Sequence, residues 1–280
     1  MEPNIQLLII DPQNDFCDLP ESWRPLDPIS GQRLAPALPV PGAHADMLRL
    51  AELIGRLSAH LAGITVTLDS HHRFDIAHPT FWQTGDGHAV PPFTPITAAQ
   101  ARAGQYQPRD PAALPRALAY MDELERRGRY TLMVWPVHCE IGSWGHGVHA
   151  AVKAAYNRWE ETRLEVARKI VKGSNPWTEH YSALQAEVPD PNDPGTQMNT
   201  SLIAELDRAD QIWVAGQASS HCVRATVEHL VDALPSGQSG KITLITDCMS
   251  PVAGFEVQQQ EFFEAMRARG VVLRGCAEQT

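Results

Sequence analysis

The feature that most constrains the fold is a series of short, continuous apolar runs separated by segments of helical spacing. Each run has the length of a strand and lacks the polar alternation of a sheet with one solvated face, so the runs predict strands buried on both faces. They lie at Leu7 to Ile10, Ile64 to Leu68, Thr131 to Val134, Ile212 to Ala215 and Ile242 to Ile245.

Two further apolar runs also predict strands, one interrupted by charged residues and one close to the end of the sequence. Ala167 to Val171 is weaker because Arg168 and Lys169 interrupt it, and Val271 to Leu273 would add a last strand. The segments between the runs place apolar residues three and four positions apart, as amphipathic helices do. These segments are Met47 to Leu57, Ala151 to Trp159, Leu202 to Leu206, Val223 to Leu234 and Phe262 to Met266.

Strands that alternate with helices pair in parallel through right-handed crossovers. The sequence therefore predicts an α/β fold: a three-layer, doubly wound, mainly parallel sheet of about six strands with helices on both faces.

Two stretches rich in proline, glycine and polar residues interrupt this rhythm, at about residues 21–41 and 70–111. Connections of this length are uncommon in a compact domain unless they have a use, so we expect active-site walls, lids or subunit contacts there. No internal repeat and no clear linker divides the chain, and α/β folds often use about this length as one unit. We therefore predict one domain over residues 1–280 with two long loop insertions.

Charge and composition exclude several classes of partner. The 33 acidic and 23 basic residues give a formal net charge of -10, which repels a phosphate backbone, and no basic patch opposes it. No apolar run approaches the ~20 residues that span a bilayer, and the amino end lacks a signal-peptide pattern. The five cysteines are odd in number and scattered, so we expect reduced thiols and a cytoplasmic location, with no nucleic acid and no membrane as partner.

Reactive side chains follow the expected strands directly. In open α/β sheets, ligands bind beyond the carboxyl ends of the strands. The first strand is followed by Asp11, the second by residues 69–72 (DSHH), the third by residues 135–138 (WPVH), the interrupted run by Lys172, and the next by residues 216–222 (GQASSHC). The expected sheet would bring a nucleophile, an acid, a base and metal-ligand types to one edge.

Asp11, Lys172 and Cys222 form a chemically sufficient set for acyl transfer. A carboxylate can accept a thiol proton, a nearby ammonium favours both anions, and a thiolate attacks acyl carbons. Each residue also has an ordinary interpretation: a turn-capping aspartate, a solvated lysine, and a cysteine acting as a small buried hydrophobe. The expected helix start at Cys222 favours a reactive thiol, because N–H groups and the helix dipole there lower a thiol pKa.

A second set of side chains has the composition of a metal site. Asp69, His71 and His138 offer a carboxylate and two imidazoles, which suit zinc, iron or manganese with positions left open. His72 competes with His71 as a ligand, and His78 could join the site or cap a turn. With 12 histidines in the chain, a chance cluster is the competing interpretation.

Four aromatic residues lie near these groups in the sequence and would offer flat apolar surface to a substrate. They are Phe16, Trp135, Trp177 and Tyr181. Aromatic side chains usually fill cores, so core packing remains the alternative for each of them.

Five segments in the same order resemble one known family. The segments are LLIIDPQNDF, DSHH, WPVHC, VKG followed by YSAL, and AGQASSHCVRATVEHL, from residue 5 to about residue 255. Together they resemble the isochorismatase-like cysteine hydrolase superfamily, and within it the nicotinamidase/pyrazinamidase branch.

The resemblance implies a role for each matching residue. Asp11, Lys172 and Cys222 would be the catalytic triad. Asp69, His71 and His138 would bind one divalent metal ion, with zinc favoured over iron or manganese.

The resemblance also implies a cis peptide between Gln217 and Ala218, which residue-level reasoning could not suggest because such bonds are so rare outside proline. The backbone N–H groups of Ala218 and Cys222 would form the oxyanion hole. The substrate slot would be lined by Phe16, Trp135, Tyr181 and His221.

The implied activity is hydrolysis of nicotinamide to nicotinate and ammonia through a cysteine thioester, as part of NAD metabolism, by a homo-oligomer. Ser220 departs from the family pattern, because many nicotinamidases have an aspartate two residues before the cysteine. His78 is a poor positional match to the third histidine that some members use, so we expect three protein ligands. Two alternatives stay open: hydrolysis of another small amide or carbamoyl compound, and a catalytically silent binding or regulatory relative.

Overall fold

The fold is built on one six-stranded sheet. In this computed structural model, which describes residues 4–278, the strand order is β10-β9-β8-β1-β2-β7 and every neighbouring pair is parallel. The strands are β1 (Ile5–Ile10), β2 (Leu61–Asp69), β7 (Arg168–Lys172), β8 (Gln211–Gly216), β9 (Ile242–Ile245) and β10 (Val272–Arg274).

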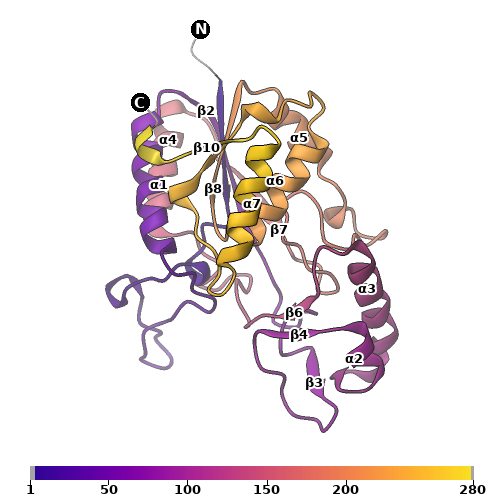
Figure 1. The fold of residues 1–280 in the computed structure, drawn as a ribbon. Helices are drawn as coiled ribbons and strands as arrows, with labels where there is room; N and C mark the ends of the chain where they lie inside the picture. Colours follow the sequence, from indigo (N-terminus) through magenta and orange to yellow (C-terminus); the bar gives the residue numbers. More distant parts are fainter. Residues whose placement is uncertain (1–3, 279–280) are drawn as a thin grey trace.

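Helices cover both faces of this sheet (Figure 1). Helices α1 (Ala43–Leu57) and α4 (Ala150–Arg163) pack together on one face, and α5 (Thr200–Asp207) and α6 (Cys222–Ala233) lie on the other. Helix α7 (Glu256–Ala268) packs against α6 and β10. The three-layer, doubly wound α/β fold predicted from the sequence is therefore confirmed.

Strand β7 occupies an edge of the sheet, which explains its weak sequence pattern. A strand with one free edge and one partly solvated face does not need a continuous apolar run. Arg168 forms an ion pair with Glu205, and Lys169 Nζ lies 3.1 Å from Glu160 Oε1. The charged residues that interrupt the run thus pair at the surface.

The run at Thr131 to Val134 does not join the main sheet, contrary to our expectation. Strand β6 (Leu132–Val134) pairs antiparallel with β4 (Thr94–Ile96) in a separate two-stranded sheet. Leu132 and Val134 are buried, so their pattern resembles that of a central strand. They are buried in a different set of apolar side chains, which periodicity alone does not reveal.

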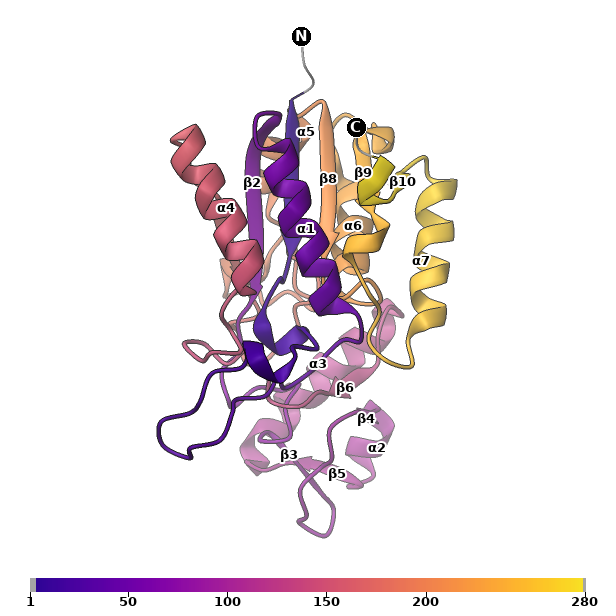
Figure 2. The ribbon, with the colours of Figure 1, turned by 90° about the vertical axis from the view of Figure 1, so that its left-hand side faces the viewer.

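The segment expected as a loop at 70–111 carries its own secondary structure. It contains β3 (Trp82–Thr84), β4, α2 (Ala98–Arg102) and β5 (Tyr106–Pro108), followed by α3 (Leu114–Arg127). These elements surround a second hydrophobic cluster, formed by Ile76, Phe81, Trp82, Val90, Ile96, Ala98, Ala101, Ala113, Ala117, Tyr120, Met121, Leu124, Leu132 and Val134. Figure 2 shows this part of the molecule beyond the carboxyl ends of the main strands.

The other long connection is largely irregular. Residues 21–41 contain a short 3-10 helix (Glu21–Trp23) and otherwise turns and isolated bridges. Leu38 and Val40 anchor the connection through buried side chains.

The strand register brings the carboxyl ends of β1 and β8 level with each other, and likewise those of β2 and β7. Ile10 pairs with Gly216, and Asp69 pairs with Lys172. Gly216 has φ 121°, and a Cβ at this position would lie 2.0 Å from the carbonyl oxygen of Ile10. Only glycine lets the end of β8 approach β1 this closely.

No helix in the described part of the chain combines the length and apolarity that crossing a membrane would require.

Candidate active site

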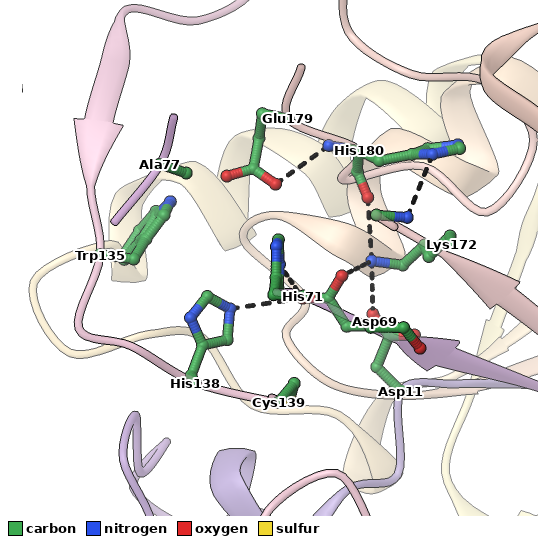
Figure 3. A network of polar contacts seen from close by, with 12 residues as sticks. Asp11, Asp69, His71, Ala77, Trp135, His138, Cys139, Lys172, Glu179 and His180 are labelled. Atoms are coloured by element: carbon green, nitrogen blue, oxygen red, sulfur yellow. Dashed lines mark hydrogen bonds and ion pairs between the residues drawn. The ribbon is translucent and has the colours of Figure 1, made fainter. Parts of the chain in front are cut away.

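The three residues expected as a catalytic triad meet at the carboxyl end of the sheet. Lys172 Nζ lies 3.0 Å from Asp11 Oδ2 and 3.6 Å from Cys222 Sγ. All three side chains are buried. The ammonium also donates to the carbonyl oxygen of His180 at 2.9 Å (Figure 3).

Local backbone geometry sets the position of Asp11. The residue directly follows β1 and has φ 41°, a left-handed conformation that aspartate tolerates better than most residues. Its N–H donates to Thr67 Oγ1 at 3.0 Å, and the Thr67 hydroxyl donates back to Asp11 Oδ1 at 2.5 Å. Oδ2 is left to face Lys172.

The resting site favours a protonated thiol. Burial raises the pKa of Cys222 well above its usual value, and the charge of Lys172 offsets only part of this effect. We expected a lowered pKa from the helix start; that expectation is wrong because burial and the nearby carboxylates of Asp11 and Asp69 oppose the thiolate. Cys222 would therefore need a base in order to act as a nucleophile.

The ammonium and the carboxylates of the site are strongly coupled. Burial lowers the pKa of Lys172, but the negative charges of Asp11 and Asp69 outweigh this and hold the pKa well above its ordinary value. Burial raises the pKa of Asp11 despite the opposing charge of Lys172. Lys172 thus stays positively charged between two buried acids.

Asp69 links the triad to a group of histidines. Its Oδ1 accepts a hydrogen bond from Lys172 at 2.9 Å, and its Oδ2 lies 3.1 Å from His71 Nε2 and 3.3 Å from His138 Nε2. The Gln13 side chain fixes the backbone of Asp69 through two hydrogen bonds of 2.8 Å. The three residues expected as metal ligands are therefore brought together.

His78 also lies in this group, as one of the two alternatives left open from the sequence. Ligand atoms of His71, His78 and His138 all lie within 4.8 Å of one another, and all three side chains are buried. His72, the competitor of His71 in the sequence, is exposed and is not part of the cluster. His78 reaches the site because the chain turns back at residues 75–78, where His78 N–H donates to the carbonyl oxygen of Asp75.

The chemistry of these side chains fits a divalent ion. Burial lowers the pKa of His78 to about 3, so its imidazole is neutral and able to act as a ligand. His78 Nε2 and His138 Nδ1 face each other at 3.3 Å. His71 Nδ1 lies 3.1 Å from Asp75 Oδ2, the kind of carboxylate contact that orients a metal-binding histidine.

The loop before Cys222 contains the residues expected to form an oxyanion hole. The peptide between Gln217 and Ala218 is cis, as the resemblance implied. Gln217 Nε2 donates to Asp46 Oδ2 at 2.8 Å, and Ser219 N–H donates to the carbonyl oxygen of Ser250 at 2.9 Å. Among residues 4–278, no acceptor contacts the N–H groups of Ala218 and Cys222.

A small cavity is lined by Cys222 of the triad and by Asp69 and His138 of the metal-donor group. Its volume is about 30 Å³, and all four residues expected in the substrate slot line it. Trp135 Nε1 donates to the Tyr181 hydroxyl at 2.9 Å, which fixes two of these rings. The lining side chains are Phe16, Leu38, Asp69, Trp135, His138, Glu179, Tyr181, Ala218, His221, Cys222 and Val252.

Trp177, which we considered as a fourth aromatic side chain near the substrate, does not line this cavity. It packs against the second hydrophobic cluster, and the guanidinium of Arg116 lies 4.1 Å from its ring centroid. The ordinary interpretation of an aromatic residue, packing, holds for Trp177.

Glu179 lines the cavity but was not identified from the sequence. Its Oε1 accepts a hydrogen bond from the N–H of His180 at 2.9 Å, whereas its buried Oε2 has no partner in the described part of the chain. Burial raises the pKa of this carboxyl. Inspecting the loop after Lys172 further along the chain would have found it.

Comparison with known proteins supports the fold. No family model and no curated protein matches the sequence. Among solved structures, a nicotinamidase/pyrazinamidase from Acinetobacter baumanii matches with a TM-score of 0.63 and 18% identity, covering 99% of each chain. The yeast nicotinamidase Pnc1p bound to nicotinaldehyde matches with a TM-score of 0.62 and 18% identity, covering 97% of this chain and 99% of the other.

A third match is the pyrazinamidase of Pyrococcus horikoshii in complex with zinc, with a TM-score of 0.52 and 18% identity over 98% and 99% of the two chains. The resemblance to nicotinamidases stated from the motifs is thus confirmed as a likeness of fold.

Proposed function

We propose that this protein is a metal-containing amidohydrolase that converts nicotinamide to nicotinate and ammonia through a thioester on Cys222. The observation that carries the proposal is the position of Lys172, which lies between Asp11, Asp69 and Cys222. The ammonium of Lys172 contacts the thiol, the base and one of the metal donors, and the thiol and that donor line one small cavity. The structural likeness to nicotinamidases supports the same activity.

The proposed reaction begins with proton transfer from Cys222 to Asp11. Because burial raises the pKa of both groups, the proton moves between a buried thiol and a buried carboxylate as the sulfur attacks. The sulfur bonds to the carboxamide carbon, and the N–H groups of Ala218 and Cys222 stabilise the oxyanion. Asp11 then returns the proton to the leaving nitrogen, and ammonia departs.

Hydrolysis of the thioester completes the cycle. Asp11, again a carboxylate, takes a proton from a water molecule that attacks the acyl carbon. The bond from the carbon to the sulfur then breaks, and Asp11 returns the proton to the sulfur, so that Cys222 leaves as a thiol and Asp11 is again a carboxylate. Lys172 keeps Asp11 oriented, and its positive charge stabilises the negative charge that Asp11 and Cys222 carry in turn.

In this proposal, the histidine cluster binds the metal ion that lies beside the substrate. Asp69, His71, His78 and His138 would hold a divalent ion, with zinc favoured over iron or manganese, and the ion would supply a Lewis acid beside the substrate. Trp135 and Tyr181 would place a flat ring between the ion and the sulfur.

Further parts of the proposal concern the protein as a whole. We propose a single domain that acts as a homo-oligomer in the cytoplasm on a small amide, in NAD metabolism. The net charge of -10 supports the absence of a nucleic acid partner.

The deciding experiment is ammonia release from nicotinamide by purified, zinc-loaded protein and by its Cys222→Ala variant. We expect at least a thousandfold loss in the variant. Cys17→Ala is the matched control, because Cys17 is also a buried cysteine but does not line the cavity.

Equal turnover in wild type and Cys222→Ala would overturn the mechanism. An intact ion and thiol with no nicotinamide turnover would overturn the substrate and favour another small amide. The observation behind that alternative is Ser220, whose hydroxyl lies 2.9 Å from His221 Nδ1 where many nicotinamidases have an aspartate.

A further inference from the structure

Two cysteines outside the active site lie in direct contact. Cys248 Sγ and Cys276 Sγ are 2.9 Å apart, although the residues are 28 positions apart in the sequence. Cys248 follows β9 and Cys276 follows β10, and these two strands are parallel neighbours. Both residues therefore lie at the same end of the sheet, where the described chain is about to finish.

The backbone around both cysteines is fixed by hydrogen bonds. Both carboxylate oxygens of Asp247 accept the N–H of Cys276, at 2.8 and 3.0 Å. From α1, Arg49 donates to the carbonyl oxygen of Asp247 at 2.6 Å, and Arg56 donates to that of Cys276 at 2.8 Å. The two sulfurs are thus held together by interactions that do not involve the thiols themselves.

We infer that Cys248 and Cys276 form a reactive thiol pair that a low-molecular-weight disulfide oxidises to an intramolecular disulfide. The inference does not rest on the proposed function.

The burial of the two thiols sets the order of the reaction. Cys276 is the more accessible, at 7% exposed against 0% for Cys248. The hydrogen bond with Cys276, and then burial, raise the pKa of Cys248, so this thiol does not react first. The Cys276 sulfur attacks one sulfur of the oxidant, the oxidant's S–S bond breaks, and one small thiol leaves with the proton.

Cys248 then attacks the Cys276 sulfur of the mixed disulfide and releases the second small thiol. In total, two protein S–H bonds are exchanged for one S–S bond, and the oxidant's disulfide is reduced to two thiols.

A metal site is the competing use of this pair, because Asp247 and the two sulfurs lie close enough together to hold an ion. Oxidation is favoured because both Asp247 oxygens already accept the Cys276 N–H, and because the group offers only three donors where structural zinc takes four.

The new bond would have a structural consequence close to the active site. Residues 249–252 follow Cys248 directly, and Ser250 accepts the N–H of Ser219 in the loop that carries Cys222. A disulfide between Cys248 and Cys276 would tie the last strand to the segment that supports this loop.

The experiment treats the whole reduced protein with oxidised glutathione, alkylates the remaining thiols after unfolding, and maps the peptides by mass spectrometry. We expect a cross-linked peptide pair containing Cys248 and Cys276, and alkylated Cys17 and Cys139. The melting temperature should rise by about 5–10 °C and fall again with dithiothreitol. Cys248→Ser should abolish both effects, whereas Cys17→Ser should retain them.

Comparing oxidised with reduced wild-type protein decides the matter even if a variant does not fold. The inference is overturned if both thiols remain free, if glutathione stays attached to Cys276, or if the purified protein holds zinc at this pair and a chelator is needed before the thiols react.

Discussion

The ammonium of Lys172 lies 2.9 Å from Oδ1 of Asp69, so one ion pair joins the triad to the histidine cluster. The same nitrogen lies 3.0 Å from Asp11. Removing this charge would leave two buried carboxylates without their cation, which is the costly way to break a buried ion pair.

We therefore predict that Lys172→Met lowers the free energy of unfolding by about 3–5 kcal/mol near neutral pH. Without the ammonium, the carboxyl pKa values in the folded state rise, so part of the lost stability should return as the pH falls and the carboxyls protonate. Urea unfolding at pH 5 and pH 7.5 measures this. Lys169→Met is the control on the same strand, and its exposed ion pair should contribute less than about 1 kcal/mol.

His78 is predicted to be a metal ligand. His78→Ala should weaken zinc binding at least tenfold, because the ion would lose one of its donors. Titration of metal-free protein with zinc by calorimetry measures the affinity. His72→Ala, which removes an exposed histidine from the same loop, should leave the affinity unchanged; equal affinity in the two variants would place the ion elsewhere.

Asp69 should matter to both parts of the site. In Asp69→Asn, one oxygen remains for the ion while the negative charge beside Lys172 is lost. We expect weaker zinc binding together with a fall in turnover, measured by elemental analysis and ammonia release. Full retention of the ion in this variant would contradict the role assigned to Asp69.

Glu179 is predicted to contact the bound substrate. Its buried Oε2 lines the cavity and has no partner in the described part of the chain, so a substrate N–H would be its natural donor. Glu179→Gln should lower kcat/KM for nicotinamide about 10- to 100-fold with little change in melting temperature, since a hydrogen bond to a charged group contributes about 1.5–3 kcal/mol. Glu140→Gln, at a more exposed carboxylate, serves as the control.

Glu187 should make stability depend on pH. Burial raises its pKa from 4.5 to about 7 in the folded protein, despite the opposing charge of Arg129. The folded state therefore holds this proton while the unfolded chain releases it, and stability is lost as the pH rises from about 4.5 to about 7. Between low and high pH, the free energy of unfolding should fall by up to about 3 kcal/mol less in Glu187→Gln than in the wild type. Urea unfolding between pH 4.5 and 8 measures this difference.

Most of the main sheet could be predicted because its strands are buried on both faces and leave a continuous apolar pattern. The same pattern misled us at β6, because Leu132 and Val134 are equally buried in the second hydrophobic cluster. Burial is visible in a sequence, but the identity of the neighbouring strand is not.

The candidate site was predictable where residues lie at the carboxyl ends of strands: Asp11 directly follows β1, whereas Asp69 and Lys172 are the last residues of β2 and β7. Glu179 was missed, and the place of His78 was left open, because each lies several residues into a loop, where the path of the chain is set by tertiary contacts. The pKa of Cys222 was misjudged for a related reason, since the burial of this side chain is not a property of the residue type.

The second hydrophobic cluster carries β6, from which Trp135 and His138 extend into the cavity, while Asp11, Lys172 and Cys222 are anchored in the main sheet. Phe16, Trp135 and Tyr181, which line the cavity, nevertheless pack together with Cys222 in the core of the main sheet. In the proposed enzyme, the side chains that would recognise the substrate and the thiol that would attack it therefore share one packed core, so a substitution that reshapes the slot would also shift the reacting group.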